Sequence, residues 1–128
     1  MVKERLLKMK KICFFMALVM ILLSPVLAFA ESYSGFELTC TCSITSTKGK
    51  ASTSGATKPY YNYVSVIVYK NGDSKASNLK RVEGSEASTT ASYSLGGLTK
   101  AMSNHYVCNS SYNPVGNARE TIVKYAER

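Results

Sequence analysis

The chain has 128 residues, with 16 Lys and Arg against eight Asp and Glu, and a formal net charge of +8. Five of the basic residues lie in the first 30 positions, so the remainder carries 11 basic and seven acidic residues. Only Lys80 and Arg81 are adjacent in that remainder. Scattered cations do not form the basic stripe that follows a phosphate backbone, and we therefore expect no nucleic-acid partner.

The N-terminal segment has the three parts of a secretory signal. A basic stretch precedes an apolar run of 12 residues, Ile12 to Leu23, and Ser24-Pro25 interrupts the run. Ala28-Phe29-Ala30 then places small residues at both positions that a signal peptidase reads. The run is shorter than the roughly 20 residues of a transmembrane helix. We expect residues 1–30 to be a cleaved signal peptide, and residues 31–128 to be secreted, meeting a membrane only before cleavage.

Residues 36–46 alternate between apolar and polar side chains, which predicts a strand with one buried face. The apolar positions are Phe36, Leu38, Cys40, Cys42 and Ile44. Thr47 to Lys50 contains Gly49 and predicts a turn. Residues 50–55 are expected to return as a short strand.

Residues 60–70 give the strongest strand signal in the chain. Val64, Val66 and Val68 share one face of this strand, while Tyr63, Ile67 and Tyr69 share the other. Apolar character on both faces is typical of a central strand. Asn71-Gly72 follows at once and predicts a tight hairpin, with the return strand within residues 76–83.

Three more strands are expected in the C-terminal half. Residues 87–95 alternate small apolar residues with serine and threonine, and Gly96-Gly97 ends the pattern. Residues 98–103 are predicted to be a connection, with room for one helical turn. Residues 105–111 and 119–125 form the last two predicted strands, separated by a loop at 113–117.

Short strands at this spacing, without a long helical pattern, predict an all-β fold. We expect a small antiparallel β-sandwich of about seven strands, immunoglobulin-like or Greek-key in order, spanning residues 31–128. A small barrel is the alternative.

Three cysteines follow the signal segment: Cys40, Cys42 and Cys108. An exported chain meets oxidising conditions, so a disulfide is expected. Cys40 and Cys42 share a strand face, which makes a bridge between them awkward, and each is instead a candidate partner for Cys108. Zinc would need these thiols with His105, but Cys-x-Cys is not the usual spacing. We expect no metal and no cofactor.

Catalytic residues are scarce in this sequence. His105 is the single histidine, and Ser103 and Ser110 flank it without a neighbouring acid. Glu83 and Glu86 are expected to be solvated turn charges. The sequence therefore predicts a protein that is not an enzyme.

Tyrosines are the better candidates for function, because nine of them lie after residue 30. A tyrosine side chain offers a large contact area at low entropic cost and stacks on sugars or peptides. The candidate binding residues are Tyr60, Tyr61 and Tyr63, together with His105 and Tyr106 on a later strand.

The chain resembles small secreted β-sandwich proteins of Gram-positive bacteria, including the lactococcin-like bacteriocins. The resemblance rests on the basic signal ending in Ala28-Phe29-Ala30, on the alternating segment 87–95, and on Ser103-Asn104-His105-Tyr106-Val107. It implies action at the envelope of a neighbouring cell. The chain differs from that group in having no tryptophan and three cysteines after the signal.

Two functions are therefore expected. The first is a secreted, non-catalytic module that binds at a cell envelope or extracellular surface, with a wall glycan, wall precursor or surface protein as its partner. The second is a lactococcin-like bacteriocin acting on related bacteria.

Overall fold

A computed structural model describes residues 27–115 and 121–128. Every regular element within these residues is a β-strand. The eight strands are β1 Leu27–Tyr33, β2 Phe36–Ile44, β3 Lys48–Ser54, β4 Tyr61–Lys70, β5 Asp73–Glu83, β6 Ala87–Ser92, β7 Lys100–Cys108 and β8 Ile122–Glu127.

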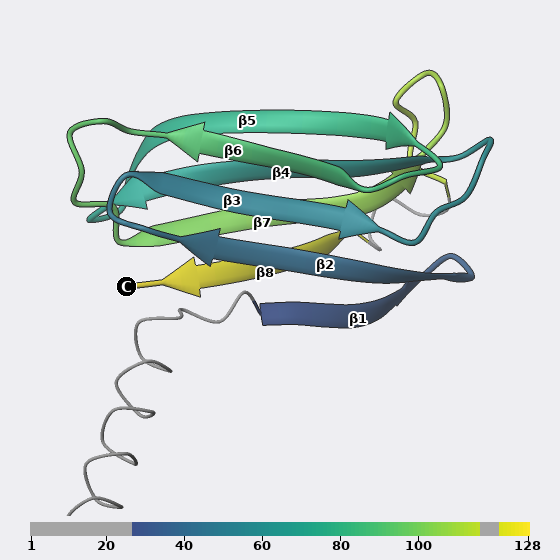
Figure 1. Cartoon of the computed structure of the whole chain (residues 1–128), viewed down its shortest axis with the longest axis horizontal. Helices are drawn as coiled ribbons and strands as arrows, with labels where there is room; N and C mark the ends of the chain where they lie inside the picture. Colours follow the sequence, from purple (N-terminus) through teal and green to yellow (C-terminus); the bar gives the residue numbers. More distant parts are fainter. Residues whose placement is uncertain (1–26, 116–120) are drawn as a thin grey trace, which may run out of the picture.

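The strands form two antiparallel sheets that pack face to face (Figure 1). One sheet has the order β1-β2-β3-β6 and the other the order β5-β4-β7-β8. Strand β6 packs beside β5, β3 over β4, and β2 over β7 and β8. The predicted small antiparallel β-sandwich is confirmed, with eight strands where about seven were expected.

Strand β4 is central, as its two apolar faces predicted, because it pairs with β5 on one side and β7 on the other. The Asn71-Gly72 hairpin is also confirmed. These residues have φ angles of 50° and 89° and connect the paired residues Lys70 and Asp73. Positive φ at both central residues is the backbone of a type I′ turn, which suits the twist of adjacent strands.

Alternation places the core between the sheets. Val64, Val66 and Val68 of β4 are fully buried against small residues of the facing sheet, such as Ala51 and Ala91. The approach is closest at Gly49, where an added Cβ would lie 2.3 Å from Cγ1 of Val68. Glycine is therefore required at this position by packing.

A buried asparagine ties two connections to the end of β4. Asn62 is fully buried, and its Oδ1 accepts a hydrogen bond from the backbone N–H of Ala56 at 3.0 Å. Its Nδ2 donates to the carbonyl oxygens of Ala56 at 3.2 Å and Ser85 at 2.7 Å. A single side chain thus satisfies three backbone groups, of which the two of Ala56 are buried.

Two C-terminal predictions need correction. Strand β7 begins at Lys100, so the connection predicted at 98–103 is wrong; Ala101 and Ser103 are small, which weakened the apolar signal. Strand β6 ends at Ser92, and Leu95 is 80% exposed rather than inside. Residues 116–120 of the predicted final loop and strand lie outside the described residues.

Strand β1 was not expected, because its residues were assigned to the end of the signal peptide. It pairs with β2 over seven residues, from Leu27 opposite Cys42 to Tyr33 opposite Phe36. The predicted cleavage position after Ala30 therefore falls inside a strand. Residues 1–26 of the predicted signal peptide lie outside the described residues.

The expected disulfide is not formed, since Cys40, Cys42 and Cys108 are all free and buried. Cys40 and Cys42 point from β2 into the core, as their spacing predicted. Cys108 lies on the other side of the second sheet, because it alternates with the inward-facing Val107. Strand β7 thus separates the thiols that were expected to meet.

Candidate functional site

The two outer faces of the sandwich differ in chemistry. On β2, β3 and β6 the outward side chains are mostly serine, threonine and lysine, for example Thr41, Lys50 and Ser88. On the β5-β4-β7-β8 sheet they are largely aromatic and aliphatic. We call this second surface the aromatic face; it comprises Tyr61, Tyr63, Ile67, Tyr69, Leu79, Arg81, Lys100, Met102, Tyr106, Tyr112, Val123 and Tyr125.

One end of the aromatic face unites three of the five predicted binding residues. Tyr63 of β4 lies directly opposite Tyr106 of β7, and their rings stack with centroids 4.1 Å apart and planes inclined by 19°. Tyr61 lies two residues away on the same side of β4. Burial is the main cause that raises the pKa of Tyr106, and a hydrogen bond to the Glu83 carboxylate raises that of Tyr61. The phenols of Tyr61 and Tyr106 are therefore neutral at physiological pH.

Arg81 of β5 completes this end of the aromatic face. Its guanidinium lies 3.6 Å from the ring centre of Tyr112 and 4.5 Å from that of Tyr61. Its Nη1 donates to the carbonyl oxygens of Ser110 at 2.8 Å and Asn109 at 3.2 Å. Through these hydrogen bonds and ring contacts, Arg81 holds the loop after β7 against the outer face of the sheet. This role could not be predicted from the sequence, because it requires Arg81 to meet residues 28 and 29 positions further along the chain.

The opposite end of the aromatic face is hollowed. A depression of about 300 Å³ is lined by Tyr69, Thr99, Lys100, Met102 and Tyr125, with Gly72 at its rim. Tyr125 is 53% exposed, and Nζ of Lys100 lies 4.5 Å from its ring centre. An open aromatic wall beside a cation can hold a flat ring by stacking and a polar substituent by charge.

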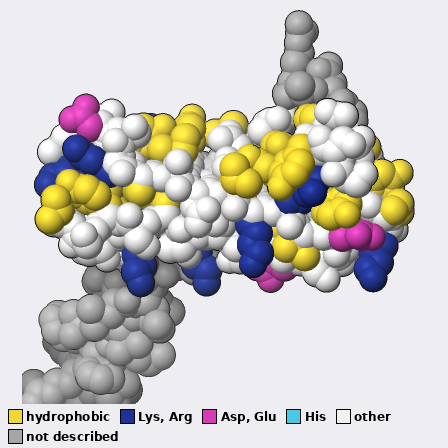
Figure 2. Space-filling model, turned by 90° about the horizontal axis from the view of Figure 1, so that it is seen from above, with side chains coloured by type: hydrophobic (Ala, Val, Ile, Leu, Met, Phe, Trp, Pro, Cys, Tyr) yellow, Lys and Arg dark blue, Asp and Glu magenta, His cyan; other side chains and the backbone are white. Residues whose placement is uncertain are grey.

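The surface distribution is visible from above the β5 and β6 side of the molecule. Hydrophobic side chains gather toward both ends of that view, and basic side chains lie among them (Figure 2). Polar atoms dominate the middle. On the aromatic face itself, the strand register places Tyr61, Tyr63 and Tyr106 toward the start of β4, and Tyr69 and Tyr125 toward its end.

His105 was predicted to contribute to binding, but the structure does not place it on the aromatic face. Its side chain points inward from β7 and is fully buried. Nε2 lies 2.7 Å from Oγ of Ser103, and Nδ1 lies 2.6 Å from Oγ1 of Thr53. Burial, assisted by Lys124, lowers the pKa of His105 to about 4, so the imidazole is neutral. The alternation that exposes Tyr106 necessarily buries its neighbour.

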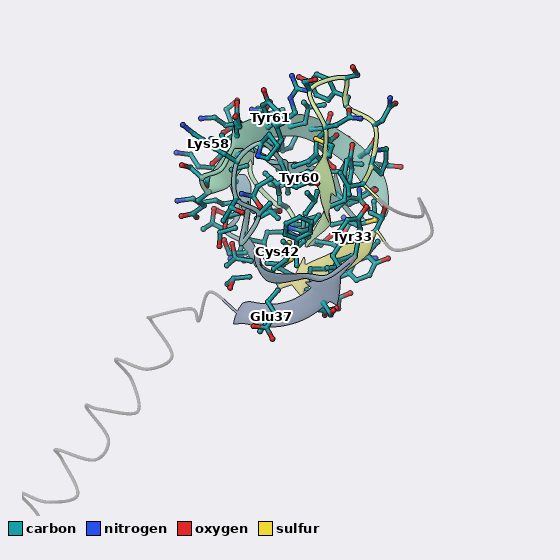
Figure 3. All side chains as sticks on the ribbon, turned by 90° about the vertical axis from the view of Figure 1, so that its right-hand side faces the viewer. Tyr33, Glu37, Cys42, Lys58, Tyr60 and Tyr61 are labelled. Atoms are coloured by element: carbon teal, nitrogen blue, oxygen red, sulfur yellow. The ribbon has the colours of Figure 1, made fainter. Side chains whose placement is uncertain are left out.

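Tyr60 is also separate from the aromatic face. It precedes β4, is 36% exposed, and its ring packs edge-on against Phe36 with centroids 5.2 Å apart. Figure 3 views this end of the sandwich, where Tyr60 and Tyr61 come from adjacent positions while Glu37 projects outward from β2. The predicted tyrosine run is therefore divided between two surfaces.

Among residues 27–115 and 121–128, no three His, Cys, Asp or Glu side chains come together as a group that could hold a metal ion. The thiols are protonated, because burial raises the pKa of each, that of Cys40 to about 11. The described part of the chain contains no helix of the length and apolarity needed to cross a membrane.

Comparisons with protein families, with curated proteins and with solved structures found no match for this chain.

Proposed function

We propose that this chain is an exported, non-catalytic binding protein that attaches to a cell envelope through its aromatic face. The observation that carries the proposal is the contrast between the two outer faces. Serine and threonine suffice to solvate a sheet, as they do on β2, β3 and β6. Tyrosines concentrated on the other sheet instead offer contact area, and exposed apolar patches of this kind mark interaction sites.

The chemistry of the ligand follows from the rings. Phenol faces stack on the apolar faces of sugar rings, while the hydroxyl groups and nearby cations bond to polar substituents. A wall glycan therefore suits this surface better than an apolar ligand, since the depression lined by Tyr69 and Tyr125 is open.

The position of the histidine supports a role without catalysis. The chain has one histidine, and both of its ring nitrogens are engaged inside the core. The Ser103–His105 contact has the length of a nucleophile–base pair, but both side chains are fully buried and no substrate reaches them. Export is supported by the basic, apolar and small-residue pattern of residues 1–30.

Retention of the protein on isolated Gram-positive cell walls tests the proposal. We expect the exported protein to be retained, and Tyr63→Ser and Tyr125→Ser each to weaken retention by about tenfold, the effect of losing about 1.4 kcal/mol of contact. Both side chains lie on the outer surface, so the fold should survive their loss.

Tyr60→Ser is the matched control, because it removes an exposed tyrosine that lies off the aromatic face. Equal retention of all three variants would refute the aromatic face as the binding surface. Failure of the parent protein to bind any wall fraction would refute the envelope as its target.

A bacteriocin acting on related bacteria is the second candidate. It is favoured by the position of the segment 103–107, which carries the resemblance to lactococcin-like proteins and supplies Tyr106 to the aromatic face. Growth inhibition by the exported protein that disappears in Tyr63→Ser would establish this activity as a consequence of binding. Growth unaffected at saturating occupancy of the wall would exclude it.

A further inference from the structure

Strand β1 contains the position at which the signal peptide is expected to be cleaved. Four of its seven residues, Leu27 to Ala30, precede that position. They pair with Thr39, Cys40, Thr41 and Cys42 of β2. The same four residues cannot both leave with the signal peptide and remain paired with β2, so processing must change this edge of the sandwich.

The part of β1 that stays is anchored independently. Tyr33 is fully buried in the core, and Glu31 forms an ion pair with Lys124 of β8. Residues 31–33 therefore keep their pairing with Phe36 to Leu38. Cleavage after Ala30 opens the edge only beyond this point, along Thr39–Cys42.

Removal of Leu27 to Ala30 leaves those backbone N–H and C=O groups of Thr39–Cys42 that are directed toward β1 without their strand partner. The groups directed toward β3 keep their partners. Strand β8 does not replace it, because β8 belongs to the other sheet. The structure itself shows what fits this edge, namely an extended antiparallel segment. An unpaired edge of this kind is a template for a further strand.

The opened edge also lacks the charges that normally discourage strand addition. No charged residue lies between Glu37 and Lys48. In contrast, β5, which is one of the two edge strands of the other sheet, carries Lys75, Lys80 and Arg81. Charged side chains protect natural sheet edges, and β2 was protected by β1 until processing.

The register permits two copies of β2 to pair with each other. Antiparallel pairing about a two-fold axis at Thr41 sets Thr41 opposite its counterpart in the second copy and Cys40 opposite Cys42. Outward threonines then meet outward threonines, and buried cysteines meet buried cysteines, so both copies keep the alternation of β2.

We propose that removal of residues 1–30 converts this protein into a two-fold dimer, in which β2 of one copy pairs antiparallel with β2 of the other along Thr39–Ser43. The inference rests on the export and cleavage included in the proposed function. It concerns a different surface from the aromatic face, so both copies present their tyrosines to a ligand.

The test uses the product that a secreting Gram-positive host releases from the full-length chain. Its N-terminus is sequenced, and its mass is measured by sedimentation over a concentration series. We expect an N-terminus at Glu31 and a dimer. Thr41→Lys should raise the dissociation constant at least tenfold, because like charges then face each other across the two-fold axis.

Ser88→Lys is the matched control, because it adds the same charge to the same face of the sheet on its other edge strand, β6. It should dimerise like the parent, and circular dichroism should show equal folding of all three proteins. A monomer beginning at Glu31, or equal dissociation of both variants, would overturn the proposal. An N-terminus at or before Leu27 would show that processing leaves β1 intact, and this would also overturn the proposal. Loss of wall retention alone would concern only the aromatic face.

Discussion

Nε2 of His105 and Oγ of Ser103, two positions apart on β7, lie 2.7 Å from each other inside the core. Strand alternation puts them on the same face, and Thr53 of the opposite sheet binds the remaining ring nitrogen. The histidine thereby links the two sheets through polar contacts inside the core. Protonation of the ring would place an additional positive charge near Lys124.

This linkage predicts stability that depends on pH. The pKa of His105 is lowered from 6.5 to about 4 in the folded protein. The unfolded chain therefore binds one more proton between these values. The contribution of neutral His105 to the stability of the folded protein is complete above pH 6.5 and is lost as the pH falls toward 4. We expect urea denaturation to show a free energy of unfolding that is lower by about 3 kcal/mol at pH 4 than at neutral pH.

His105→Gln provides the control, since its amide can bond to both hydroxyls but does not titrate in this range. We expect the slope of stability against pH between 6.5 and 4 to flatten in this variant. A slope identical to that of the parent would assign the pH dependence to groups other than His105.

Asn62 is predicted to be a stability determinant rather than a binding residue. Asn62→Leu leaves the buried backbone N–H and C=O groups of Ala56 without this partner, at a cost of about 2–4 kcal/mol. Urea denaturation at neutral pH measures the effect. Asn78→Ala, which removes an exposed amide that donates to the Thr90 carbonyl, should cost less than about 1 kcal/mol. Equal costs would contradict the assignment.

Gly49→Ala should destabilise the sandwich by about 1–3 kcal/mol, because the new methyl group would overlap Cγ1 of Val68. The backbone at Gly49 does not have a positive φ, so the cost arises from packing alone. Thermal unfolding of Gly49→Ala, Val68→Ala and the double variant measures the coupling. We expect the double variant to be more stable than the sum of the single effects predicts, and strict additivity would refute the packing explanation.

Arg81→Ala should loosen the loop after β7 and expose the thiol of Cys108, which is fully buried beside this loop. Losing about 1.4 kcal/mol of local contacts raises the open population about tenfold. The rate of Cys108 modification by a maleimide measures this opening in a background without Cys40 and Cys42. Lys80→Ala removes a neighbouring charge without these contacts and should leave the rate unchanged.

The sequence predicted the elements whose alternation is strong. β2 and β4 were located almost to the residue, and the Asn71-Gly72 turn determined the pairing of β4 with β5. The start of β7 was missed because Ala101 and Ser103 are small and weakly apolar. Strand β1 was missed because one stretch of sequence satisfies both a signal-peptide pattern and a strand.

The candidate site was only partly predictable, for a geometrical reason. Sequence spacing showed that Tyr61, Tyr63 and Tyr106 each share a strand face with apolar neighbours, but not which face is outward. The burial of His105 and the exposure of Tyr106 follow from how the second sheet packs on the first. Arg81 and Tyr112 could not be linked in the sequence, since only the folded loop brings them together.

The contacts that bridge the two sheets at their edges limit how far the protein can polymerise. On one side, Asn78 of β5 donates to the Thr90 carbonyl of β6, which occupies a backbone acceptor of that edge strand. Lysines on β5 repel a strand approaching from the same side. Two-fold pairing of β2 with β2 uses the opened edge of both copies and closes on itself, whereas a head-to-tail contact between two different edges would grow into a fibre. The sandwich is therefore built so that association through β2 ends in a closed pair.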